Sequence, residues 1–161
     1  MGTNAPLLAV EELSVAFGGR GSAPVKAVDG VSFSLEEGKV TGLVGESGCG
    51  KSVTSLALMG LLPDRGVEVG GRALMQLPKG PEDLLVLPQR RMRDLRGSQL
   101  AMIFQDPLSS LNPVVPIGRQ VTEILKRHRG MRGEAARKEA ADLLHRVGIP
   151  DPTRRPVSYT H

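Results

Sequence analysis

The feature that most constrains this chain is a glycine-rich run between two apolar segments, GLVGESGCGKSVTSLALMG at residues 42–60. Within it, residues 45–52 fit the pattern G-x-x-x-x-G-K-[ST]. The glycines allow positive φ, so that successive backbone N–H groups can converge on one concavity. A helix that begins at the loop adds its free N–H groups and the positive end of its dipole. The run therefore predicts a phosphate-binding loop.

The pattern predicts a role for two polar side chains of the loop. Lys51 would reach the β- and γ-phosphates of a nucleotide, and the hydroxyl of Ser52 would ligate Mg²⁺. We interpret Cys49 as a small side chain that the loop accommodates, with a cysteine nucleophile as the alternative. The alternative for the whole run is a glycine-rich turn between a strand and a helix that binds no ligand.

Composition restricts the class of ligand. With 161 residues, the chain is long enough for one domain with a buried core. Aromatic residues make up 2% of the chain and Trp is absent, so the base-stacking surfaces of single-strand nucleic-acid binders would be hard to build. This scarcity opposes nucleic acid as the main ligand. The single Cys excludes an internal disulfide and fits a reducing compartment.

The chain carries a net charge of +4, from 21 Lys and Arg against 17 Asp and Glu. Two basic clusters contribute much of this charge: Arg90, Arg91, Arg93 and Arg96, and then Lys126, Arg127, Arg129, Arg132, Arg137 and Lys138. We interpret them as solvated helix faces. Attraction to a phosphate-rich partner or an anionic membrane surface is the alternative. No apolar run approaches the roughly 20 residues of a membrane-spanning helix, so none is expected.

Hydrophobic periodicity and turn residues predict a strand-rich part followed by a helical part. Strands are predicted at residues 7–17, 26–35, 40–45, 67–75 and 98–105. Helices are predicted at residues 52–62, 88–97, 116–129 and 133–148. The strand at 40–45 leads into the glycine-rich loop, and its apolar sequence predicts burial on both faces. The change of character near residues 105–116 predicts two subdomains.

Finer patterns predict details within these elements. Asp29-Gly30 interrupts the alternation of strand 26–35, which predicts an irregularity at that point. Each of the last two helices has one apolar stripe at helical spacing. The stripe residues are Ile117, Val121, Ile124, Leu125 and His128 in the first, and Ala136, Ala140, Leu143, Leu144 and Val147 in the second.

Three stretches carry a resemblance to a known family: AVDGVSFSLEEGKVTGLVGESGCGKS, AMIFQDPLSSLNP and GIPDPTRR. With them the chain resembles the ATP-binding subunits of bacterial dipeptide and oligopeptide importers, which are ATP-binding-cassette (ABC) ATPases. The resemblance runs from about Leu8 to the last residue. It implies an α/β fold, the P-loop NTPase nucleotide-binding domain. Residues 1–161 would be the N-terminal part of that domain, with a β subdomain and P-loop core at 1–105 and an incomplete helical subdomain at 106–161.

The resemblance also implies roles for particular residues. Phe17 matches the aromatic residue that stacks on adenine, although a plain core Phe is the alternative. Gln105 matches the glutamine that contacts magnesium and the attacking water, so Lys51 and Gln105 are the expected catalytic residues and Ser52 and Gln105 the expected magnesium ligands. The expected nucleotide-binding set is Phe17, Gly45, Glu46, Ser47, Gly48, Cys49, Gly50, Lys51, Ser52 and Val53.

For the whole protein, the resemblance implies MgATP binding and hydrolysis coupled to peptide uptake. The implied cofactors are ATP and Mg²⁺. The implied partners are membrane-spanning permease subunits, a second ABC ATPase subunit in a homo- or heterodimer and, indirectly, an extracytoplasmic solute-binding protein. Nucleic acid is not among them. The implied location is peripheral, at the cytoplasmic face of the inner membrane.

The chain departs from the family pattern after the glutamine. The LSGGQ-type signature, the strand that ends in Asp followed by the catalytic Glu, and the switch histidine are not found. We therefore expect an N-terminal piece of a longer protein that binds nucleotide without hydrolysing it, and a strand at 40–45 that lacks sheet neighbours. A non-catalytic remnant or regulatory module, and a DNA-acting relative, are the alternatives. The histidines His128, His145 and His161 have no metal-ligand spacing.

Overall fold

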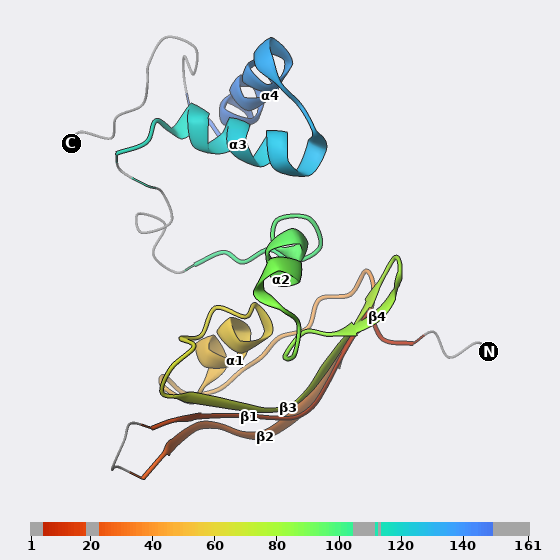
Figure 1. Ribbon diagram of the computed structural model, residues 1–161, viewed down its shortest axis with the longest axis vertical. Coiled ribbons are helices and arrows are strands. Elements are labelled where there is room, and N and C mark those ends of the chain that lie inside the picture. The colour runs from red at the N-terminus through yellow and green to blue at the C-terminus, as the bar shows by residue number, and fades with distance from the viewer. Residues whose placement is uncertain (1–4, 19–22, 105–111, 113, 150–161) are drawn as a thin grey trace. The chain divides into compact units, whose positions relative to one another are not determined.

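The structure is a computed structural model that describes residues 5–18, 23–104, 112 and 114–149. The chain divides into two compact units, Met1–Arg96 and Gly97–His161 (Figure 1). The subdomain boundary predicted after Gln105 falls outside the described residues and stays a prediction. No described helix is long and apolar enough to cross a membrane.

The first unit is built on an antiparallel sheet with the strand order β2-β1-β3-β4 (Figure 1). Its strands are β1 (Leu8–Phe17), β2 (Val25–Leu35), β3 (Val67–Leu77) and β4 (Gly80–Asp83). The predicted strands at 7–17, 26–35 and 67–75 are thus confirmed. The pairing also confirms the irregularity at Asp29-Gly30, because Val15 pairs with Val28 while Leu13 pairs with Val31.

The sheet core depends on a bulge in β1. Val10 and Leu13 are both buried, and the two exposed glutamates between them break the alternation. Glu12 has a φ of 48°, and the pairing of β1 shifts at this point against both of its neighbours. Ser32 stabilises the bulge, since its hydroxyl accepts from Glu12 N at 2.9 Å and donates to Glu12 Oε1 at 3.1 Å. The extra residue lets both halves of β1 face one core.

Two short helices complete the described part of this unit. They are α1 (Lys51–Leu58) and α2 (Gln89–Leu95), which confirms helices in both predicted places, although α1 ends before the predicted Leu62. The guanidinium of Arg96 donates through Nε to Met59 O at 2.7 Å and through Nη2 to Gly60 O. An arginine that satisfies terminal carbonyls stabilises a helix end. Arg96 therefore fixes the C-terminal end of α1.

The prediction of a strand at residues 40–45 is wrong, because this segment has no regular secondary structure. Val40 is 100% and Val44 is 93% exposed, so neither lies in a core. None of the described strands pairs with the segment. Without a neighbouring ladder the backbone groups have no partners that would hold them extended. Residues 101–104 likewise form no strand, contrary to the prediction for 98–105.

The second unit contains α3 (Ile117–Arg129) and α4 (Gly133–Arg146), which confirms both predicted helices. Their buried residues are Ile117, Leu125, Ala136, Ala140 and Leu144. Two members of the predicted stripes are exposed, Ile124 by 57% and Val147 by 73%. Val147 lies beyond the end of α4. In the described ranges, α4 is the helix that makes the most contacts with α3. It covers a narrow face of α3 that leaves Ile124 exposed.

An ion pair between β4 and α2 makes the stability of the first unit pH-dependent. Arg91 Nε donates to Glu82 Oε2 at 3.0 Å, and Arg91 Nη2 donates to Glu82 Oε1. The hydrogen bonds from Arg91 lower the pKa of the Glu82 carboxyl below its ordinary value, and the same contact raises the pKa of Arg91. A lowered carboxyl pKa stabilises the fold above the ordinary Glu value, and this contribution is lost as pH falls through the lowered pKa.

We therefore expect Glu82→Gln to lower the free energy of unfolding near neutral pH, with a difference from the parent that shrinks in acid. Urea unfolding of both proteins at a series of pH values measures this difference. Glu68→Gln is the matched control, because Glu68 is an exposed β3 carboxylate that has no ion pair within the described residues. A Glu82→Gln effect that stays constant with pH would contradict the role of the charge.

Candidate functional site

The glycine-rich loop takes the backbone conformation that its sequence predicts. Gly48 has a φ of 84° and Gly50 a φ of 92°, both in the region that favours glycine. Cys49 N donates to Glu46 O at 3.3 Å, which closes a turn within the loop. The two positive φ values confirm the backbone requirement of a phosphate-binding loop.

Gly50 joins the loop to the sheet. A Cβ atom on Gly50 would lie 2.3 Å from the carbonyl oxygen of Ala27 in β2, so no other residue fits without displacing the backbone. Gly50 O accepts from Thr54 N at 2.8 Å, and Thr54 is buried. The same glycine therefore fixes the position of the loop and the start of α1.

The N-terminus of α1 has free donors. Its N-cap is Gly50, which has no side chain to cap the helix, and the first turn contains no acidic residue. The first hydrogen bond of the helix comes from Thr54 N. The N–H groups of Lys51, Ser52 and Val53 therefore lack a helical acceptor, as the first turn of a helix does. Such a terminus attracts anions through its donors and its dipole.

The side chain of Lys51 lies back over the loop. Its Nζ donates to Gly45 O at 2.7 Å and to Glu46 O at 2.6 Å, and it lies 3.4 Å from Cys49 Sγ. These acceptors are neutral, so the positive charge of Lys51 is solvated without being cancelled. Sequence reasoning missed these carbonyl partners, because no side-chain pattern signals them.

A cavity of about 380 Å³ lies beside the loop. Its lining includes Lys51 and Cys49 from the loop, Thr54 from α1 and Val28 from β2. The cavity is also lined by Asp29 of β2 and not by Ser52 or Val53, so Lys51 is the part of the loop's donor set that borders it. The loop itself combines the free donors at the start of α1 with the uncancelled charge of Lys51. This arrangement suits a phosphate group, and it provides the glycine backbone, lysine and hydroxyl that a magnesium nucleotide requires.

Phe17 lies on β1, which pairs with β2, the strand that Gly50 of the loop contacts. It is half-buried at the end of β1, where it pairs with Val25 of β2 and Val67 of β3. Gly50 approaches β2 at Ala27, two residues from Val25, which corresponds to about 7 Å along a strand. The structure thus brings Phe17 near the loop in register, while its stacking role stays a prediction.

The remaining predicted site residues are not all described. Gln105 lies outside the described residues, so its place relative to the loop stays a prediction. Ser52 is exposed at the start of α1. Within the described ranges, no group of three or more His, Cys, Asp or Glu side chains could hold a metal ion. Of the two expected magnesium ligands, Ser52 lies at the loop and Gln105 is not described, so the magnesium site stays a prediction.

The contact of Gly50 with β2 gives a test of the loop geometry. Gly48→Ala introduces only left-handed strain, since nothing lies within 4 Å of the added Cβ, and should lower the free energy of unfolding by about 1–2 kcal/mol. Gly50→Ala adds a clash with the Ala27 carbonyl and should lower the free energy of unfolding by clearly more than Gly48→Ala does. Urea unfolding of the two variants measures the difference. Equal losses would show that Gly50 is not held against β2.

Comparison with known proteins agrees with this geometry. A family model described as "ABC transporter" matches residues 28–161. The chain is 47% identical over 156 residues to the dipeptide transport ATP-binding protein DppD of Escherichia coli (strain K12), covering 96% of this chain and 46% of the relative. It is 50% identical over 157 residues to a protein of Brucella abortus (strain 2308) that is named for peptide import, again covering 46% of the relative. The chain thus spans about half the length of these curated relatives.

Solved structures show the same fold. A dimeric structure of the ATP-binding cassette MJ0796, described as bound to ADP and Pi, superposes with a TM-score of 0.67 at 21% identity, over 86% of this chain and 56% of that chain. A second dimeric structure of MJ0796 gives a TM-score of 0.68 over the same shares. These matches confirm the predicted fold class. By its family match and its fold, this chain belongs to the ABC transporter family.

Proposed function

We propose that this chain forms the nucleotide-binding part of an ATP-binding subunit of a bacterial peptide importer, and that the whole protein couples MgATP binding and hydrolysis to peptide uptake. The observation that carries the proposal is Lys51, held over a loop with two positive-φ glycines at the free N-terminus of α1. The names of the relatives, for dipeptide transport and peptide import, support the peptide substrate.

The loop would bind the β- and γ-phosphates of ATP. The free N–H groups of Lys51, Ser52 and Val53 would donate to phosphate oxygens. Lys51 Nζ would exchange the carbonyls of Gly45 and Glu46 for these oxygens, which is favourable because hydrogen bonds to charged acceptors are stronger than those to neutral ones. The Ser52 hydroxyl would ligate the Mg²⁺ that neutralises the phosphates.

Two more residues would complete the chemistry. Phe17 would stack on adenine at the end of β1, and Gln105 would contact magnesium and orient the attacking water. We propose Lys51 and Gln105 as the catalytic residues of the whole protein. The boundary between the β subdomain and the helical subdomain would follow Gln105.

The proposed partners follow from a transport role. They are membrane-spanning permease subunits, a second ABC ATPase subunit and, indirectly, an extracytoplasmic solute-binding protein. The dimeric form of the MJ0796 structures supports the second subunit. The proposed location is the cytoplasmic face of the inner membrane, where the protein would bind peripherally.

The first test of this proposal is Lys51→Ala. In the protein expressed from its full reading frame, we expect MgATP to bind about 10-fold to 150-fold more weakly, because a hydrogen bond to a charged group contributes about 1.5–3 kcal/mol. ATP hydrolysis should fall to background. Isothermal titration calorimetry and phosphate release measure the two effects. Lys39→Ala is the control, since Lys39 is an exposed lysine that pairs with Glu36 in the preceding turn. Unchanged affinity in Lys51→Ala would refute the proposed site.

The second test separates base stacking from phosphate binding. Phe17→Leu keeps an apolar side chain at the end of β1 and removes the ring, so ATP affinity should fall about 2-fold to 12-fold if stacking contributes about 0.5–1.5 kcal/mol. Affinity for magnesium tripolyphosphate, which has no base, should not change. Calorimetry with both ligands measures this contrast. Equal losses for the two ligands would indicate a core role for Phe17.

A further inference from the structure

The backbone itself closes the last turn of α1. Gly60 has a φ of 59°, and its N–H donates to Ala57 O at 2.9 Å. The next N–H group, that of Leu61, donates to Leu56 O at 2.9 Å. These two hydrogen bonds form a Schellman motif, in which a left-handed glycine ends a helix. The helix therefore ends through its own residues, and its termination does not require Arg96.

Arg96 ties this closed end of α1 to α2. Its Nε donates to Met59 O at 2.7 Å and its Nη2 donates to Gly60 O, while its own N–H donates to Met92 O at the end of α2. Met92 is buried, and a Cβ atom on Gly60 would lie 3.0 Å from Arg96 Nη2 and 3.3 Å from Met92 Cε. The contact is close and has two hydrogen bonds from one planar group, so it fixes the direction of the helix end as well as its position.

The helix between the two ends is short. α1 has eight residues, which corresponds to a length of about 12 Å, and a helix of two turns is not stable by itself. At its start, Gly50 is held against Ala27 O of β2. A helix held only there would pivot about Gly50 and turn the free N–H groups of its first turn away from their common direction. The contact with Arg96 prevents this movement, because it holds the other end.

The charge of Arg96 acts on the same helix. Arg96 is half-buried, and in the part of the chain that the structure describes it forms no ion pair. Its guanidinium lies at the C-terminal end of α1, where a positive charge stabilises the helix dipole. A phosphate at the N-terminal end would interact with the opposite pole of that dipole. Arg96 and a bound phosphate would therefore stabilise the same short helix from its two ends.

We propose that Arg96 is a positioning residue for the phosphate loop. Its two hydrogen bonds hold α1 in the orientation in which the N–H groups of Lys51, Ser52 and Val53 meet the phosphates of MgATP. The inference rests on the proposed nucleotide binding and deepens it, because it assigns part of the affinity to a residue at the opposite end of α1. The Schellman motif already ends the helix, so orientation is the effect that Arg96 adds.

The test compares Arg96→Met with the parent in the protein expressed from its full reading frame. Isothermal titration calorimetry should show MgATP and magnesium tripolyphosphate binding about 10-fold more weakly, which corresponds to the loss of about one hydrogen bond to a charged group. The two factors should be equal, because the N–H groups of α1 meet the phosphates and not the base.

Arg96→Lys separates geometry from charge. It keeps the positive charge but lacks the planar fork of the guanidinium, so it should still bind both ligands more than about 3-fold more weakly than the parent. It also carries the comparison if Arg96→Met does not fold. Full affinity in Arg96→Lys would overturn the proposal, because the charge alone would then be sufficient.

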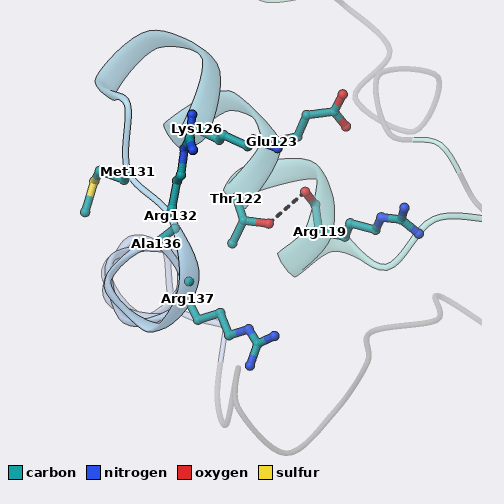
Figure 2. Close-up of a pocket in the computed structure, with 9 residues that line it drawn as sticks. Arg119, Thr122, Glu123, Lys126, Met131, Arg132, Ala136 and Arg137 are labelled. Atoms are coloured by element: carbon teal, nitrogen blue, oxygen red, sulfur yellow. Dashed lines mark hydrogen bonds between the residues drawn. The ribbon is translucent and has the colours of Figure 1, made fainter.

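Two other arginines provide matched controls. Arg91→Met removes a two-point contact of the same helix α2, but this contact is with Glu82 of β4. It should lower the free energy of unfolding and leave both affinities within about 2-fold of the parent, as expected for independent sites. Arg137→Met removes the same charge from an exposed residue of α4, for which Figure 2 shows no hydrogen bond to the other residues drawn. It should change neither affinity.

The remaining outcomes are decisive as well. Unchanged affinities in Arg96→Met would overturn the proposal. An equal loss of affinity in Arg91→Met would also overturn it, because general destabilisation would then explain both variants. Failure of the nucleotide proposal is distinguishable, since Lys51→Ala would then bind MgATP as tightly as the parent. Failure of this inference alone would leave Lys51→Ala weakened and Arg96→Met unchanged.

Discussion

The close approach of Gly50 to β2 is the constraint on which the candidate site depends. A Cβ atom there would lie 2.3 Å from Ala27 O, so the loop is pinned to the sheet at a position that only glycine can occupy. The start of α1 follows, through the hydrogen bond from Thr54 N to Gly50 O. The position of β2 depends in turn on β1, whose Leu13 and Val15 are fully buried. The geometry of a surface loop is therefore set by the core of the sheet beneath it.

The contrast between paired and unpaired cations separates structural from functional roles. Arg91 and Arg129 each bind a carboxylate, and Arg96 binds the carbonyls that end α1, so these residues stabilise particular contacts. Lys51 has no carboxylate partner in the described parts of the chain. An uncancelled charge in a cavity keeps its attraction for an anion, at a cost in stability that binding would offset.

Sequence patterns predicted the elements that depend on their own residues. Alternation in 7–17 and 26–35 predicted β1 and β2, including the irregularity at Asp29-Gly30, because side-chain period and local turn residues decide these features. The pattern failed at 40–45, where apolar residues predict a strand but a strand also requires a paired neighbour. It failed again at Ile124, because the width of a buried helix face depends on how many elements cover it.

In the candidate site, too, the sequence predicted the features that depend on local residues and missed those that depend on how the loop folds. The spacing of Gly45, Gly50, Lys51 and Ser52 predicted a loop with positive-φ glycines at a helix N-terminus, and the backbone has this form. The hydrogen bonds of Lys51 to Gly45 O and Glu46 O could not be predicted, since they depend on where the loop folds back upon itself. They change the energetics of phosphate binding, because Lys51 must give up two hydrogen bonds to gain new ones. Its net contribution is the difference between charged and neutral acceptors, so the free N–H groups of α1, which have no helical acceptors to give up, carry a larger share of the affinity than the motif alone suggests.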